Sequence, residues 1–109
     1  MFYSQGDIIE VSFDPSLGHE PQNRRPALVI SEDEFNRMSS LVFLAPITTT
    51  LSGYPLHILL PKECDVNGAV CIEQSRSLDL DVRRHEKVCE LDETTMSAIL
   101  EAVGAVFGL

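Results

Sequence analysis

Arginine is the residue type in this chain best suited to bind phosphate. Six of the eight basic residues are arginines, and four of them form two adjacent pairs, Arg24–Arg25 and Arg83–Arg84. The planar guanidinium can bind two oxygen atoms at once, which suits phosphate better than the single ammonium of lysine. Any phosphate-bearing ligand would have to bind where these few cations gather.

The total charge argues in the opposite direction. The chain carries a formal net charge of −9 at pH 7, whereas nucleic-acid binding requires local positive charge. Composition alone therefore favours a protein-binding module or an enzyme acting on a small molecule. Because local clusters and not the total set the field at a site, the net charge weakens a nucleic-acid function without excluding it.

Two other side chains fit phosphate chemistry. The hydroxyl of Thr48, at the end of an apolar run, can donate a hydrogen bond to a phosphate oxygen. His19 can take up or release a proton near neutral pH. Taken singly, however, a threonine at a strand end reflects β-propensity, and an arginine or histidine on the surface is ordinary.

The sequence gives no sign of a metal or another cofactor. The three cysteines, Cys64, Cys71 and Cys89, are odd in number and lack C-x-x-C spacing, which argues against a disulfide framework and a zinc site. We expect three reduced thiols, as in a cytoplasmic protein. We also expect no membrane partner, because no stretch approaches the roughly 20 apolar residues of a membrane span and the first residues do not resemble a signal peptide.

Apolar patterning predicts that several short strands position these residues. We expect strands at residues 6–13, 26–31, 41–47, 54–60, 69–74 and 87–90. Residues 14–25 contain two prolines and a glycine and are predicted to form a long loop, of a length that is more often functional than average. Ser31 and Glu34 have capping-box spacing and predict a short helix over 32–38.

The C-terminal segment has a different pattern. Asp92 can cap a helix, and apolar residues then recur at helical spacing on one face: Met96, Ile99, Leu100, Val103, Val106 and Phe107. The predicted class is therefore mainly β (α+β). We expect one domain over residues 1–109, a small, partly open barrel with a short helix and a C-terminal amphipathic helix.

Four strings in this chain occur in a recognisable order. They are GDIIxVxFDP at residues 6–15, GHE at 18–20 followed by RPALVI at 25–30, APIT at 45–48, and EQxRSLD at 73–79. Together they resemble the MazF/PemK (Kid) family of type II toxins. The similarity covers nearly the whole chain at compatible spacing.

This resemblance implies a fold, a reaction and partners. The fold would be a small SH3-like barrel, as in the CcdB toxins, assembled as a symmetric homodimer. The activity would be sequence-specific, metal-independent cleavage of single-stranded RNA, in particular mRNA, which inhibits translation. Attack by the 2′-hydroxyl would leave 2′,3′-cyclic phosphate and 5′-hydroxyl ends. A cognate antitoxin would bind the toxin, and the toxin–antitoxin complex would bind its own operator DNA.

The resemblance also implies roles for individual residues. Arg25 and Thr48 match the family's catalytic arginine and threonine. Six further residues match positions with possible catalytic or substrate-binding roles: His19, Glu20, Arg24, Glu73, Gln74 and Arg76. In the Kid branch, an acidic residue at position 73 and an arginine at position 71 are proposed as base and acid. Cys71 stands at the second position here, so that pair is not carried over.

Other interpretations remain. A CcdB-like toxin would share the fold but bind DNA gyrase without catalysis, and such a protein would not need Arg25 and Thr48. An inactive family member is compatible with the net charge and with Cys71. A bare SH3-like module would need an aromatic groove, and the chain has no Trp and two Tyr. His57 and His85 match no motif, and we expect structural or surface roles for both.

Overall fold

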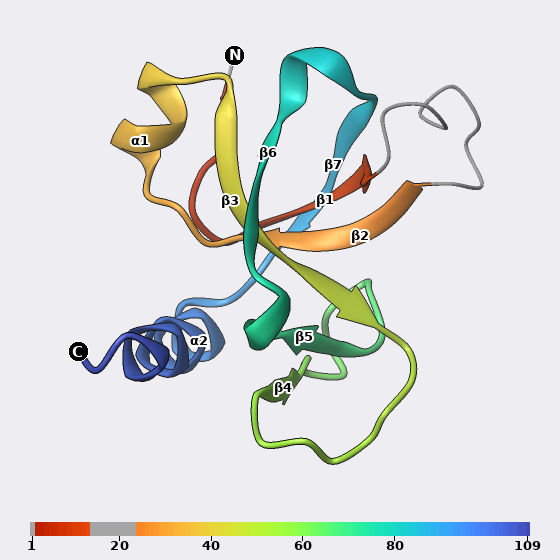
Figure 1. The fold of residues 1–109 in the computed structure, drawn as a ribbon. Coiled ribbons are helices and arrows are strands. Elements are labelled where there is room, and N and C mark those ends of the chain that lie inside the picture. Colours follow the sequence, from red (N-terminus) through yellow and green to blue (C-terminus); the bar gives the residue numbers. More distant parts are fainter. Residues whose placement is uncertain (1, 14–23) are drawn as a thin grey trace.

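The computed structural model describes residues 2–13 and 24–109. Within these residues it contains seven strands, two α-helices and two 3-10 helices (Figure 1). In chain order the elements are β1 (Asp7–Ser12), β2 (Arg24–Val29), α1 (Asp33–Met38), β3 (Leu41–Thr48), β4 (His57–Leu59), β5 (Ala69–Cys71), η3 (Ile72–Gln74), β6 (Arg76–Asp79), η4 (Leu80–Val82), β7 (His85–Glu90) and α2 (Glu93–Val106). The predicted mainly β class with a C-terminal helix is confirmed.

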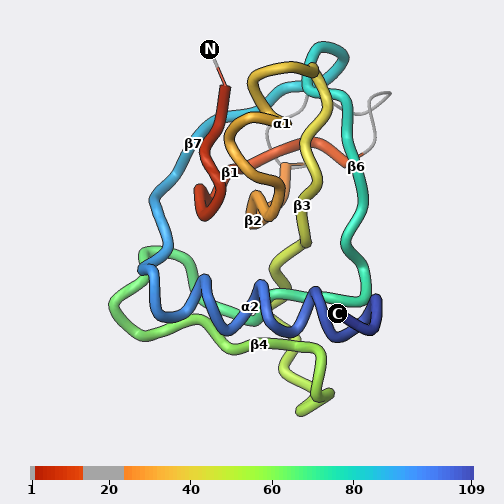
Figure 2. The backbone as a smooth tube through the Cα atoms, turned by 90° about the vertical axis from the view of Figure 1, so that its left-hand side faces the viewer, coloured from red at the N-terminus to blue at the C-terminus, as the bar shows by residue number. Residues whose placement is uncertain are grey.

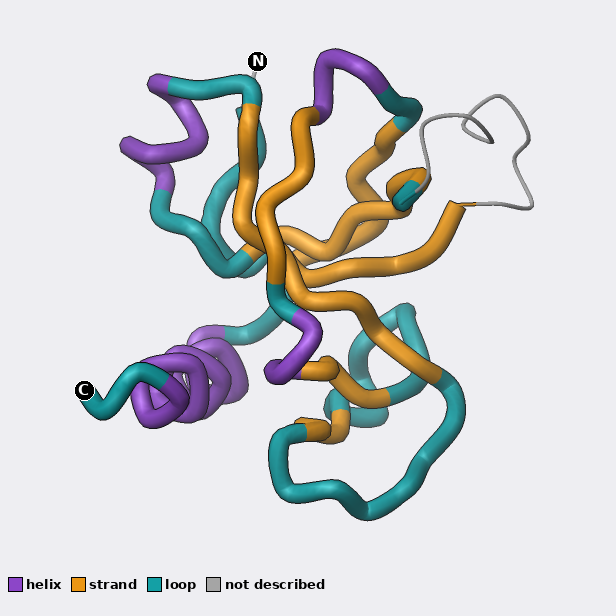
Figure 3. The backbone as a smooth tube through the Cα atoms, in the orientation of Figure 1, coloured by secondary structure: helices purple, strands orange, loops and turns teal. Residues whose placement is uncertain are grey.

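The strands form one antiparallel sheet that does not close. Its order is β4-β5-β3-β2-β1-β7, and β6 pairs with β3 outside this path. β3 is long enough to serve two partners on one edge: residues 41–44 pair with β6, and residues 47–48 pair with β5. β3 therefore connects the main body of the sheet to the small β4–β5 region, as Figure 3 shows.

The sheet is apolar on both faces. On one face the core includes Leu28 and Ala45 and extends to α2, and on the other it includes Ala27, Val29 and Leu44. Successive residues of a strand point to opposite faces. The unbroken apolar run in β2 follows from this burial on both sides, because a strand with one wet face would alternate with polar residues.

α2 covers the face near β5 and η3, and Figure 2 shows it lying across that end of the molecule. The Asp92 carboxylate accepts hydrogen bonds from Thr95 N and Oγ1, both at 2.9 Å, which confirms the predicted cap. Met96 and Ile99 are buried. Val106 and Phe107, predicted for the same apolar face, are 50% and 73% exposed because the helix extends past the core that it covers.

Several predicted boundaries were wrong. The strand predicted at 54–60 is only β4, because His57 N donates to Tyr54 O and closes a turn before it. The strand predicted at 69–74 ends at Cys71 and continues as η3. β6 was not predicted, since Leu78 is its only buried residue and four residues give too little alternation.

The predicted capping box at α1 was also wrong. The cap residue is Glu32, and its side chain makes no capping hydrogen bond. Ser31 instead binds elsewhere: its hydroxyl donates to Asn36 Oδ1 and accepts from Phe43 N at 3.0 Å. The hydroxyl thus joins the helix to β3, a tertiary contact that local spacing cannot reveal.

Candidate functional site

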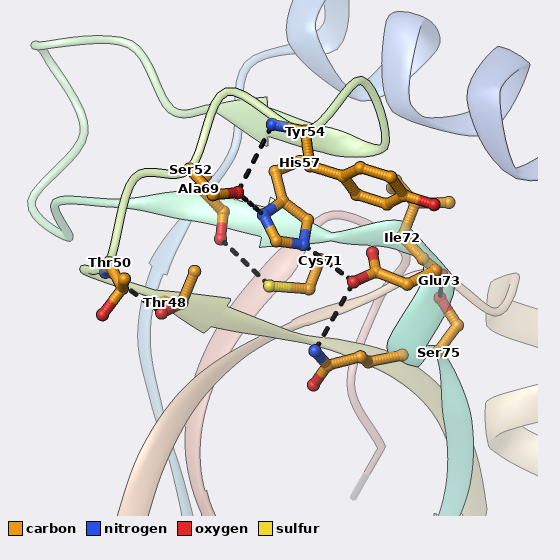
Figure 4. Close-up of polar contacts among 11 residues, drawn as sticks. Thr48, Thr50, Ser52, Tyr54, His57, Ala69, Cys71, Ile72, Glu73 and Ser75 are labelled. Carbon is orange, nitrogen blue, oxygen red and sulfur yellow. Dashed lines mark hydrogen bonds and ion pairs between the residues drawn. The ribbon is translucent and has the colours of Figure 1, made fainter.

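A hollow of about 330 Å³ opens where the end of β3 meets β2, β4 and η3. It is lined by Arg25, Pro46, Ile47, Thr48, Thr50, Ser52, His57, Cys71 and Gln74. Figure 4 shows the polar contacts along its β4–β5 side. Four separate stretches of the chain contribute to this hollow (residue 25, residues 46–52, residue 57 and residues 71–74), so it exists only in the folded protein.

Arg25 and Thr48 reach the hollow from neighbouring strands. The antiparallel register pairs Ala27 of β2 with Pro46 of β3. Arg25 lies two residues before Ala27, and Thr48 lies two residues after Pro46. Both side chains line the same hollow. The sequence predicted Arg25 at the end of a loop, whereas the structure places it on β2, paired with Val11 of β1. This regular pairing fixes its backbone, and the side chain remains exposed.

The Thr48 hydroxyl is held by the chain that follows it. Thr50 N donates a hydrogen bond of 3.1 Å to Thr48 Oγ1 (Figure 4). A hydroxyl that accepts in this way keeps its own proton available for a second partner. Thr48 can therefore donate to an oxygen atom bound in the hollow.

Gly68 allows the close approach of β5 to Thr48. A Cβ atom at position 68 would lie 2.3 Å from the Thr48 carbonyl oxygen, and Gly68 has a φ of +132°. Both observations require glycine at this position. Gly68 therefore determines how closely the backbone before β5 approaches Thr48.

His57 and Glu73 form a short polar contact beside the hollow. His57 Nε2 lies 2.7 Å from Glu73 Oε2, and Nδ1 lies 3.3 Å from Ser52 Oγ (Figure 4). Burial acts to raise the pKa of Glu73, but the hydrogen bond from His57 and weaker contributions bring that pKa below its ordinary value. Sequence reasoning missed His57, because only the strand register places it beside a residue 16 positions away.

Cys71 lies directly across the β4–β5 ladder from His57. Its thiol is buried. Burial, together with the nearby Glu73, raises the pKa of this thiol. A neutral, buried thiol cannot supply the positive charge or the readily exchanged proton expected of a catalytic acid at this position.

The remaining predicted residues divide into three groups. Gln74 lines the hollow, and its Nε2 lies 3.5 Å from Glu73 Oε2. Arg24 and Arg76 do not line it: Arg24 Nη1 lies 3.7 Å from Glu86 Oε2, and the Arg76 guanidinium lies 4.6 Å from the centre of the Phe13 ring. His19 and Glu20 lie outside the described residues.

Residues 2–13 and 24–109 contain no group of three or more His, Cys, Asp or Glu side chains placed to hold a metal ion. Over the same residues, no helix has the length and apolar character that a membrane crossing requires.

Comparison with known proteins identifies the family. The model of the "PemK-like, MazF-like toxin of type II toxin-antitoxin system" matches residues 4–107. The chain belongs to this toxin family. Among curated members, the endoribonuclease toxin ChpB of Escherichia coli is 37% identical over 113 residues, covering 95% of this chain and 94% of ChpB. Endoribonuclease PemK of Escherichia coli is 29% identical and covers 94% of this toxin and 80% of PemK.

Solved structures of this toxin family have the same fold. MazF of Deinococcus radiodurans gives a TM-score of 0.86 at 32% identity, covering 100% of this chain and 99% of that chain. A MazE–MazF complex from the same organism gives a TM-score of 0.86 at 28% identity, covering 100% and 98%. The arrangement of strands and helix described above is therefore the fold of MazF toxins.

Proposed function

We propose that this toxin is a metal-independent endoribonuclease that cleaves single-stranded RNA, with Arg25 and Thr48 as its catalytic residues. The observation that carries the proposal is their convergence from two strands on one hollow. The names of ChpB and PemK support the reaction class. Residues 1–109 would form a single domain for this purpose.

The chemistry follows from the substrate. RNA carries its own nucleophile, the 2′-hydroxyl, which attacks the adjacent phosphorus and displaces the 5′-oxygen. The protein must then stabilise the extra negative charge on the phosphorane oxygens and assist proton transfer. Arg25 supplies positive charge and a planar donor pair, and the Thr48 hydroxyl supplies a further donor. The products would be a 2′,3′-cyclic phosphate and a 5′-hydroxyl.

The test uses purified toxin and a defined mixed-sequence RNA in EDTA. We expect cleavage at a preferred sequence, with end mapping that gives the two product types above. The same RNA with a single 2′-deoxy sugar immediately before the cut should resist, because the nucleophile is missing. Cleavage of that substrate would contradict the mechanism. An intact RNA combined with tight binding to gyrase would favour the non-catalytic CcdB-like function.

We also propose a symmetric homodimer, in which one surface is used twice. Its support is a set of large apolar side chains that are exposed near α1 and the start of β3: Phe2, Phe35, Met38, Leu41 and Phe43. Sedimentation at micromolar concentration should give twice the chain mass. A monomer at that concentration would contradict the dimer.

The proposed protein partner is a cognate antitoxin, and the complex would bind its own operator DNA in the cytoplasm. A MazE–MazF complex among the similar structures supports the antitoxin. Because this toxin has a net charge of −9, general charge attraction to an acidic antitoxin tail cannot drive association. We therefore expect apolar anchors to dominate, and affinity to fall only modestly between low and moderate salt.

A further inference from the structure

The ring of His57 has a polar neighbour at each nitrogen. Nε2 lies 2.7 Å from the Glu73 carboxylate, and Nδ1 lies 3.3 Å from the Ser52 hydroxyl (Figure 4). An ionised carboxylate can only accept a hydrogen bond, so Nε2 carries the proton when the ring is neutral. The lone pair of Nδ1 is then directed at a hydroxyl group on the lining of the hollow. This is the orientation that a general base needs.

We propose that His57 is the general base of RNA cleavage in this toxin and that Glu73 is the positioning residue that holds it. The inference rests on the proposed function, since it assigns the proton transfer that Arg25 and Thr48 leave open. It also differs from the role proposed in the Kid branch for the acidic residue at position 73, which is that of the base itself.

Three observations favour His57 over its neighbours as the base. The His57 ring lines the hollow, with only 15% of its side chain exposed. The Glu73 carboxylate is already bound by His57, and the pKa of Glu73 is lowered, which makes it a weak base. Cys71 is buried, and burial raises the pKa of its thiol, so little thiolate forms near neutral pH.

Nδ1 of neutral His57 removes the 2′-hydroxyl proton, and the 2′-oxygen forms a bond to phosphorus. The bond between phosphorus and the 5′-oxygen breaks, and the leaving 5′-oxygen takes a proton from water. The imidazolium, stabilised by the Glu73 carboxylate, then returns its proton to solvent. In the unbound toxin the Ser52 hydroxyl lies 3.3 Å from Nδ1, and it would have to turn away for the 2′-hydroxyl to reach that nitrogen.

The decisive variant is His57→Gln. Its amide can still donate to Glu73 at the position of Nε2, so a purely structural role would be retained while the base is lost. Under single-turnover conditions we expect the rate to fall by about a hundred-fold or more, the range for loss of a general base. Affinity for a 2′-deoxy RNA of the same sequence should stay within two-fold of the parent. The thermal midpoint should also be retained.

His85→Gln is the matched control. His85 Nδ1 makes an equally short contact, 2.7 Å to the Tyr3 hydroxyl, but lies outside the hollow. We expect its cleavage rate to stay within two-fold of the parent. If the unsubstituted toxin leaves the RNA intact, the proposed function and this inference are both overturned. If the parent cleaves RNA in a 2′-hydroxyl-dependent way and His57→Gln is equally fast, only the inference is overturned.

Glu73→Gln tests the positioning role through the pH–rate profile. The groups that face His57 are Glu73 on η3, Cys71 on β5, Tyr54 before β4 and Arg25 on β2. Only Glu73 changes in this variant, so the other three affect both proteins alike. A neutral amide stabilises the imidazolium less than a carboxylate does. The acid limb should therefore move to lower pH and the plateau rate should fall; an unmoved acid limb would overturn the assignment of Glu73.

Discussion

Two adjacent arginine pairs look alike in the sequence but have different surroundings in the fold. The Arg83 side chain is bound to backbone carbonyls, with Nε 2.8 Å from Asp79 O and Nη1 within 3.0 Å of Ser12 O and Phe13 O. Arg25, by contrast, is exposed and lines the hollow. A guanidinium that satisfies backbone carbonyls joins β1 to η4 and is not available to a phosphate, whereas Arg25 is placed to meet one.

This comparison predicts that substitutions in one arginine pair slow cleavage, whereas substitutions in the other lower stability. Arg25→Ala should slow cleavage by about a hundred- to a thousand-fold, by analogy with loss of an oxyanion donor. Arg25→Lys should recover part of that loss, because it keeps the charge without the planar fork. Both variants should keep the parental thermal midpoint and dimer, measured by calorimetry and sedimentation. A folded Arg25→Ala protein that cleaves at the parental rate would remove Arg25 from the mechanism.

The next largest effect is expected from Gly68, which lies against Thr48 on the β3 side of the hollow. Gly68→Ala would place a Cβ 2.3 Å from the Thr48 carbonyl oxygen, so the backbone must shift and Thr48 with it. We expect a lower thermal midpoint and a slower cleavage rate, by at least ten-fold if Thr48 contributes a donor of the usual strength.

Gly53→Ala is the control for this change. Gly53 also has a positive φ, +74°, but its added Cβ would have no neighbour within 4 Å. It should carry the ordinary strain of an alanine in the left-handed region, about 1–2 kcal/mol, and keep the cleavage rate. Equal rates in the two alanine variants would show that the fit of Gly68 against Thr48 does not matter for the reaction.

Arg83→Ala should reduce stability and leave the chemistry intact. Three hydrogen bonds to part-buried carbonyls are lost, so we expect the free energy of unfolding to fall by about 1–3 kcal/mol. Urea titration measures this change, and the cleavage rate below the unfolding transition should stay within two-fold of the parent. A large rate loss in a folded protein would mean that Arg83 also acts on the substrate.

The smallest effects are expected from the outer members of the two pairs. Arg24 is weakly paired with Glu86, at 3.7 Å. Arg24→Met removes one cation near the site, so RNA affinity should fall a few-fold and its salt dependence should decrease. Arg84→Ala should change neither stability nor rate measurably, since Arg84 is exposed and outside the hollow. If both variants weaken binding equally, only the total charge matters and the comparison between the pairs fails.

The sequence by itself determined the class of the fold and most of the strands. The strand at residues 6–13, the unbroken apolar run of β2 and the cap at Asp92 were predicted from local patterns and are confirmed, although β1 is buried on both faces and not on alternate residues. The motifs also determined the family, and with it Arg25 and Thr48 as candidates. These features depend on neighbours in the chain, which a sequence displays directly.

Only the tertiary structure decided which of the chemically capable side chains meet. His57 and Glu73 become partners because β4 and β5 pair in a register that sets His57 opposite Cys71, with η3 turning directly after it. The Arg83 guanidinium binds backbone carbonyls instead of a phosphate because it lies beside the end of β1, 70 residues away in sequence. Such contacts depend on long-range packing, and a residue's type and its local spacing contain no information about it.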